Sequence, residues 1–215
     1  MTRTRIRRRL VTGFCIMGLT LATTSTLAAS DTFKQSAELG KRTAKTSDDV
    51  DRYVAQLDKT EQALASVSQA QTKELKKRND SFSRETDRLE ETQKQATSDI
   101  DQMKSTGTEY FKAWDTSIAQ MSNAELKQAS AERRSKIMKD HDDLAASLND
   151  IGSQLQPFMS NLHDLKAFME TELSSENIAK ASAMIQKSQS DALALKGKIA
   201  GVQTTLKQFL SEAPK

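Results

Sequence analysis

Few residues in this sequence could carry out catalysis or bind a metal ion. The chain has two histidines, His141 and His163, and one cysteine, Cys15. The histidines are 22 residues apart (163 − 141 = 22), which on one helix is over about 30 Å at 1.5 Å per residue, so they cannot share a metal. No His-x-x-x-His or Glu-x-x-His pair occurs, and the serines and acidic residues form no recognisable nucleophile arrangement. We therefore expect no enzyme activity, no bound metal and no cofactor.

A proline inside a helical repeat is the next candidate for a site. Pro157 lies in a segment whose apolar residues keep a seven-residue spacing on both sides of it. Because two independent helices would not share one register, we expect a single helix, kinked where Pro157 removes the hydrogen bond to Ser153. Gly152 lies one turn earlier and softens the same place. We interpret the kink as a structural bend, with a ligand-sized gap as the alternative.

Aromatic residues are concentrated in one short segment. Tyr110, Phe111 and Trp114 are followed at helical spacing by Ile118 and Met121, in a chain with only 5% aromatic residues. Large rings fill the space between helices at the thick end of a bundle, and this is the interpretation we favour. A ligand cage is the alternative.

The first thirty residues have the three parts of a bacterial secretory signal. Five arginines, at positions 3, 5, 7, 8 and 9, precede an apolar run from Leu10 to Ala22 and then a stretch of small residues. The run is shorter than the ~20 residues that span a bilayer, so we expect cleavage, after Ala28 or after Ser30, rather than a retained anchor. The predicted organisation is a signal peptide at 1–30 and one helical domain at 31–215. The mature protein is expected in the periplasm with no stable membrane span, and the export route, general secretory or twin-arginine, stays open.

Loss of residues 1–30 would change the charge of the chain. The sequence has 32 basic and 29 acidic residues, and residues 1–30 contain five of the basic ones and none of the acidic ones, which leaves 27 − 29 = −2. Since a nucleic-acid-binding protein needs a retained basic surface, we exclude that class. Cys15 would leave with the signal, so the mature chain would have no thiol for a disulfide, catalysis or a zinc site.

Apolar residues recur every seven positions through most of residues 31–215. This pattern predicts an all-α fold, an elongated antiparallel helical bundle of coiled-coil character. The strongest repeat has two columns over five heptads: Ile137, Leu144, Ile151, Phe158 and Leu165 in one, and His141, Leu148, Leu155, Leu162 and Met169 in the other. Breaks in the repeats predict helices near 48–67, 73–121, 123–171 and 176–211, after a less regular lead-in at 31–46.

Two of these breaks have local signals. Between residues 64 and 75 the repeat changes phase, which we interpret as a turn, with a stutter in one continuous helix as the alternative. Ser122 and Glu125 fit a capping box at the start of the third helix. Ser174 or Ser175 is expected to cap the last helix.

One stretch of the second helix is only half apolar. Phe82 and Leu89 continue one column of the repeat, but their companions Arg78, Glu85 and Gln93 are polar. Such a stretch cannot bury a full seam by itself, so we expect it to accept a partner helix or a second copy of the chain. These five residues are therefore the predicted interaction surface.

Two segments resemble a known family. "EYFKAWDTSIAQMSNAELKQAS" (109–130) resembles the tryptophan-containing segment, and "LQPFMSNLHDL" (155–165) the proline-containing stretch, of a proteobacterial exported helical family catalogued as domain of unknown function 2959. The similarity extends from about Glu38 to the C-terminus. Where the family usually has Lys-His-Asn, this chain has Glu170-Thr171-Glu172, whereas the matching motif positions are Pro157, Asp164, Leu173 and Ile178. The resemblance implies a helical envelope protein and supplies no activity and no site residues.

The expected function is an exported, non-enzymatic structural or adaptor protein. Its coiled-coil surfaces would bind another envelope protein or a second copy of the chain. The alternative is a periplasmic holdase chaperone that clamps unfolded envelope proteins between its helices. Such chaperones usually have a strongly basic lining, and the −2 charge of the mature chain argues against one.

Overall fold

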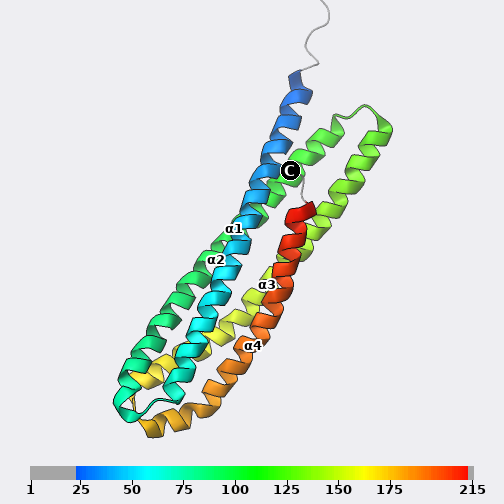
Figure 1. Ribbon diagram of the computed structural model, residues 1–215. Coiled ribbons are helices and arrows are strands. Elements are labelled where there is room, and N and C mark those ends of the chain that lie inside the picture. Colours follow the sequence, from blue (N-terminus) through cyan, green and yellow to red (C-terminus); the bar gives the residue numbers. More distant parts are fainter. Residues whose placement is uncertain (1–22, 213–215) are drawn as a thin grey trace, which may run out of the picture.

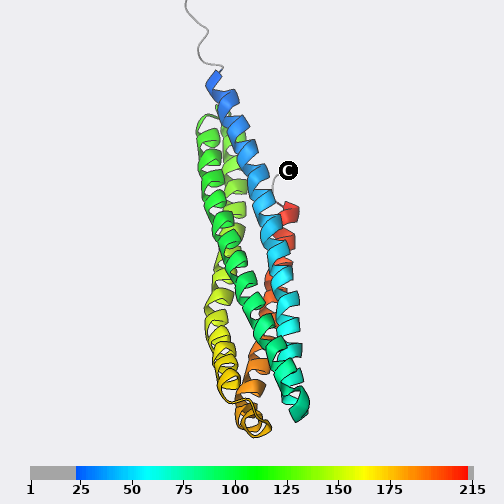
Figure 2. The same cartoon turned by 90° about the vertical axis from the view of Figure 1, so that its left-hand side faces the viewer.

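The computed structural model describes residues 23–212, with side chains described from residue 31, and these residues form an elongated bundle of four long helices (Figure 1). The helices are α1 (Thr23–Ser68), α2 (Leu75–Ala119), α3 (Ala124–Thr171) and α4 (Ser175–Glu212), with a 3-10 turn, η1 (Thr72–Glu74), before α2. Successive helices run antiparallel, and both views show α1 beside α2 along most of their length (Figure 2). The described residues contain no strand. The predicted all-α bundle is confirmed.

The apolar repeat of α3 faces the inside of the bundle. All members of both predicted columns are buried, and Leu144, Leu162 and Leu165 are at most 1% exposed. α4 contributes Ile185, Leu195, Ile199, Val202, Leu206 and Phe209 to the same core. Burial of one such side chain stabilises the folded state by about 1.5–3 kcal/mol, so the seam supplies much of the stability of the bundle.

The lead-in at 31–46 is part of α1, which corrects the expectation of a less regular segment. Its buried positions are mostly polar: Ser36, Thr43 and Thr46 accompany Leu39. Thr43 Oγ1 donates to the carbonyl oxygen of Leu39 at 2.9 Å, and Thr46 Oγ1 donates to that of Asp99 at 3.4 Å. Because these hydroxyl groups donate to main-chain oxygens, their burial costs little free energy. A search for apolar repeats alone therefore does not find this part of the helix.

The breaks between helices lie close to the predicted positions. Residues 69–74 form the turn expected between residues 64 and 75, so one continuous helix with a stutter is excluded. At the start of α3 the capping residue is Asn123, whose side-chain oxygen accepts the Leu126 N–H at 3.0 Å, and this corrects the prediction of Ser122. Ser174 caps α4 by accepting the Asn177 N–H at 3.2 Å.

Residues 1–22 lie outside the described residues, and with them the arginines, the apolar run and Cys15 of the predicted signal. The two predicted cleavage positions, Ala28 and Ser30, fall within α1. Thr32 Oγ1 donates to the carbonyl oxygen of Ala113 at 3.1 Å, so a chain cut after either position would keep this contact between α1 and α2. None of the described helices is long and apolar enough to cross a membrane.

The four helices do not all reach the same end of the bundle. The last residue of α4, Glu212, forms an ion pair with Lys136 of α3, and α1, α2 and α3 continue beyond that level (Figure 1). We call this part the three-helix end: residues 31–41 of α1, 107–119 of α2 and 124–135 of α3. Residues 124–135 alone are about 18 Å of helix at 1.5 Å per residue. The remainder of the bundle is the four-helix part.

Candidate functional site

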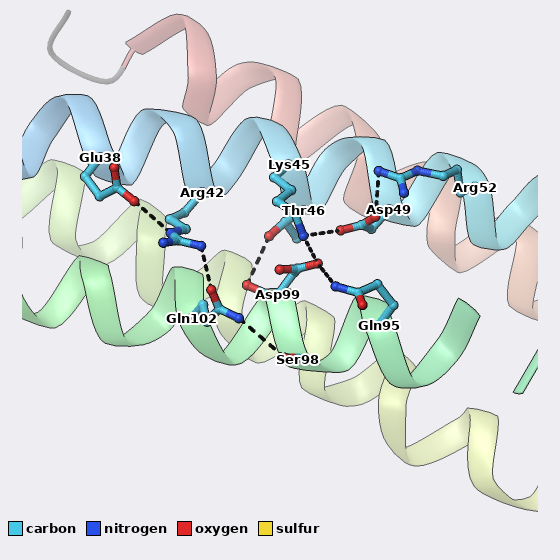
Figure 3. Close-up of polar contacts among 10 residues, drawn as sticks. All are labelled: Glu38, Arg42, Lys45, Thr46, Asp49, Arg52, Gln95, Ser98, Asp99 and Gln102. Carbon is cyan, nitrogen blue, oxygen red and sulfur yellow. Dashed lines mark hydrogen bonds and ion pairs between the residues drawn. The ribbon is translucent and has the colours of Figure 1, made fainter. Parts of the chain in front are cut away.

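The largest group of buried charged side chains lies between α1 and α2 (Figure 3). Asp49 of α1 and Asp99 of α2 are 2% and 3% exposed. Lys45 forms ion pairs with both carboxylates, at 3.5 Å from Nζ to Asp49 Oδ2 and at a shorter distance to Asp99. Arg52 Nη2 lies 2.8 Å from Asp49 Oδ1, and Gln95 Nε2 donates to Asp99 Oδ2 at 2.6 Å. We call these five residues the polar cluster.

The two carboxyl groups of the polar cluster have opposite pKa shifts. Burial raises the pKa of Asp49, and the neighbouring carboxyl group of Asp99 adds to the rise. Burial also opposes ionisation of Asp99, but the neighbouring Asp49 and the hydrogen bonds from Lys45 and Gln95 outweigh it and lower the pKa of Asp99 to about 2. Asp49 is therefore the group that takes up a proton first, and protonated Asp49 can donate to the Asp99 carboxylate.

The polar cluster can hold a proton, and its two carboxyl groups lie mostly between the helices that carry them. Neither carboxyl group is more than 3% exposed, although Asp49, Arg52 and Gln95 line a pocket of about 530 Å³ on the surface between α1 and α2. Its geometry suits the fixing of one helix against the other, a known use of buried ionic groups. Sequence analysis missed it. The available signal was the run of charged residues Lys45, Asp48 and Asp49 beside a buried column of α1.

The predicted interaction surface on α2 is mostly interior. Phe82 and Leu89 have no exposed area. Glu85 accepts a hydrogen bond from Gln56 Nε2 at 2.8 Å, and its main-chain oxygen accepts one from Thr60 Oγ1 at 3.0 Å, whereas Arg78 and Gln93 lie nearer the surface. The expectation of an open seam is corrected because α1 covers it, with Gln56 and Thr60 bonding Glu85 beside a core that includes Leu57 and Leu64.

A pocket of about 510 Å³ lies between α2 and α3 near the predicted kink. α3 runs unbroken through Pro157, so the prediction of one helix is confirmed. Ala96 and Gly152 line the pocket together with Tyr53, whose hydroxyl has no hydrogen-bond partner among the described residues. Small side chains on facing helices leave this space, and burial raises the pKa of Tyr53. A gap therefore lies near the position of the predicted kink, although Pro157 itself does not line it.

The two histidines occupy different environments. His163 Nε2 lies 3.4 Å from Glu90 at the surface. His141 is 4% exposed, and its Nε2 has no hydrogen-bond partner among the described residues. A Cβ atom on Gly107 would lie 2.2 Å from that nitrogen, so the close approach of α2 to His141 requires glycine. Within residues 31–212 no group of three or more His, Cys, Asp and Glu side chains is placed to hold a metal ion.

The aromatic segment of α2 lies in the three-helix end. Tyr110, Phe111 and Trp114 are buried, with Trp114 Nε1 donating to Ser130 Oγ at 3.0 Å, and the predicted role in the core is confirmed for these three. Tyr110 and Trp114 also form the floor of a groove of about 360 Å³. Thr32, Phe33 and Ser36 of α1 form one wall, and Arg133 of α3 lies on the other side. Below this level α4 occupies the position between α1 and α3, so the groove continues the path of α4.

Two large apolar side chains stand exposed at this end. Phe33 on α1 and Leu126 in the first turn of α3 are each 65% exposed. Sequence analysis missed both, because neither lies in the columns that form the core. The signal that could have shown them is the shortness of the fourth predicted helix relative to the second and third.

A comparison with protein-family models matches residues 34–212 to a family described as a protein of unknown function, DUF2959. The chain belongs to this family. No curated protein and no solved structure matches the chain. The DUF2959 match covers the polar cluster, the pocket at Gly152 and nearly all of the three-helix end.

Proposed function

We propose that this DUF2959 protein is an exported, non-enzymatic adaptor of the cell envelope that binds another protein through its three-helix end. One observation carries the proposal. α4 ends at the level of Lys136, whereas the other three helices continue. Phe33, which lines the groove, and Leu126, which lies seven residues before Arg133 on the same heptad column, are left largely exposed.

Large exposed apolar side chains indicate a binding site mainly when several of them lie close together. Single surface leucines are common, but an exposed phenylalanine that lines a groove together with Tyr110, Trp114 and Met121 indicates a binding site. In the four-helix part, α4 covers the equivalent surfaces of α1 and α3. Binding of a partner over the three-helix end would remove the same kind of surface from water.

Export is supported by the sequence alone. The basic residues at positions 3 to 9 and the apolar run from Leu10 to Ala22 have the order of a secretory signal. Edman sequencing or mass spectrometry of the protein recovered from the periplasm would test this part, and we expect the chain to begin at Ala29 or Asp31. A periplasmic form that retains residues 1–22 would contradict it.

Affinity capture with matched bait proteins tests the binding part. The baits are the wild type, Leu126→Asp, and Leu193→Asp as the control, because Leu193 is 70% exposed on α4 in the four-helix part. We expect a small set of partners in stoichiometric amounts, retained by Leu193→Asp and lost with Leu126→Asp. Wild-type bait that captures a broad set of unfolded proteins would indicate a holdase instead.

A further inference from the structure

The last turns of α4 show how a helix binds between α1 and α3. Leu206 and Phe209 of α4 are buried against the core, and Glu212 at its edge pairs with Lys136 of α3. Further along, Lys196 pairs with Asp58 and Glu61 of α1. A helix in this position thus combines an apolar inner face with charged edges that match those of its neighbours.

The surface of α1 that contacts α4 continues into the three-helix end with a different composition. Phe33 and Gly40 lie 28 and 21 residues before Glu61 (61 − 33 = 28; 61 − 40 = 21), on the same heptad column. Ala37 and Ala44 lie 14 and 7 residues before Asp51, whose carboxylate accepts a hydrogen bond from Gln203 of α4. Within the three-helix end these two columns carry Phe33, Ala37 and Gly40, so the acidic residues that pair with α4 further along have no counterpart there.

The matching surface of α3 changes in the same way. Ala129 lies seven residues before Lys136, on the column that pairs with Glu212. Leu126 and Arg133 lie 35 and 28 residues before Asn161, which hydrogen-bonds Asp191 of α4 at 3.5 Å. Leu126, Ala129 and Arg133 are all exposed. Both walls of the groove are thus the extensions of surfaces that bind a helix.

The charges at the groove favour an acidic occupant. Arg133 lines the groove and forms no ion pair with a described acidic residue. Lys34 and Lys41 follow Phe33 and Gly40 on the α1 edge, are exposed, and also lack such a pair. The groove itself is lined by one charged side chain, that of Arg133. Among the acidic residues of this end, Glu38 pairs with Arg42 and Asp115 pairs with Arg134. Glu125 and Glu132 precede Leu126 and Arg133 by one position and so lie about 100° around α3.

We propose that the three-helix end binds an amphipathic helix of a partner protein that carries an acidic edge, in the position that continues α4. This inference rests on the proposed adaptor function and specifies its partner. The apolar face of the partner helix covers Phe33, Leu126 and the Trp114 floor, and its acidic edge meets Arg133 and the α1 lysines. A second copy of α1 is disfavoured because an antiparallel pair of these segments would bring Lys34 and Lys41 together with their counterparts.

A labelled peptide tests the inference directly. The peptide has 16 residues, keeps the apolar spacing of α4 and carries glutamate along one edge; a control peptide has lysine in place of each glutamate. Fluorescence anisotropy should show at least tenfold tighter binding of the glutamate peptide to the wild type. Arg133→Glu should weaken that binding at least tenfold, Phe33→Asp should abolish it, and Leu193→Asp should leave it unchanged.

Several results would overturn the inference. Equal binding of the two peptides, no binding of either, or equal loss with Leu193→Asp would each exclude an acidic helix at this site. Binding seen only after removal of residues 1–22 would make that segment the occupant. Sedimentation of a wild-type dimer that Phe33→Asp dissociates would make the occupant a second copy, and preferential binding to anionic vesicles would make it a membrane surface. If wild-type bait captures partners while the peptide fails, the adaptor function stands and only this inference is wrong.

Discussion

The four-helix part and the three-helix end share three helices but differ in what covers α1 and α3. In the four-helix part, α3 buries Leu162 at 1% exposure on a core column, whereas Leu126 lies on another column of the same helix, beyond the end of α4, and is 65% exposed. On α1, Asp58 and Glu61 pair with Lys196 where α4 is present, whereas Phe33 lies beyond α4 and is 65% exposed. An apolar side chain thus reaches the surface where it lies off the core columns and no described helix covers it.

Truncation of matched leucines should give the largest difference between the two regions. Leu162→Ala removes a fully packed side chain, and we expect a loss of about 2–5 kcal/mol in the free energy of unfolding. Leu126→Ala should change it by less than about 0.5 kcal/mol, because the side chain is mostly in water. Chemical denaturation followed by circular dichroism measures both. Similar losses would mean that Leu126 is packed and that the three-helix end is not open.

Replacement of two helical glycines by alanine should change the free energy of unfolding in opposite directions. Alanine in place of helical glycine is favoured by up to ~1 kcal/mol, and Gly201→Ala should show this gain because its Cβ would meet no atom within 4 Å. Gly107→Ala should instead destabilise the protein by about 1–3 kcal/mol, since its Cβ would collide with His141. Thermal unfolding compares the two variants. In a His141→Ala background the penalty at Gly107 should disappear; a penalty that persists would locate the cause elsewhere.

The polar cluster should make the stability of the α1–α2 pair depend on pH. The pKa of Asp49 is raised in the folded state, so its contribution to stability is present at low pH and is lost as the pH rises through that pKa. The pKa of Asp99 is lowered to about 2, so its contribution is present above its ordinary value and is lost as the pH falls toward 2. The free energy of unfolding should therefore decrease as the pH rises above 3.8, the ordinary value for aspartate, and through the raised pKa of Asp49.

Asp49→Asn sharpens this test because asparagine imitates the protonated carboxyl group. We expect a gain of about 1 kcal/mol at pH 8 and a smaller pH dependence than in the wild type. Asp48→Asn is the matched control, as Asp48 is the exposed neighbour of Asp49. Urea titrations at about pH 4 and about pH 8 measure the free energy of unfolding of both variants. The same change in both variants would show that the carboxyl pair does not control the pH dependence.

The sequence was sufficient for those features that depend on apolar spacing. The two columns around Pro157 predicted a single α3, and its core positions are buried as expected. Asn123 rather than Ser122 caps α3, since both residue types accept the same hydrogen bond and the sequence does not show which has the extended backbone.

Features that depend on contacts between distant residues could not be predicted from the sequence. Ser36, Thr43 and Thr46 look like surface residues of a weak helix until α2 supplies their neighbours. The seam at Phe82 and Leu89 looked open for the same reason, because the polar residue Glu85 between them is paired by Gln56 and Thr60 of α1. The groove at the three-helix end depends on the relative levels of four helix ends, which are set by three connections and by packing along the whole bundle.

The order of the helices also has a consequence for how quickly the chain reaches its native state. Each helix contacts the next one along the chain, and α1 with α4 forms the one extensive contact between distant helices, through pairs such as Lys196 with Asp58, 138 residues apart. Proteins dominated by local contacts fold fast, since little loop entropy is lost before each contact forms. The α1–α2 hairpin can therefore assemble while the rest of the chain is still being synthesised, and the arrival of α4 closes the bundle last.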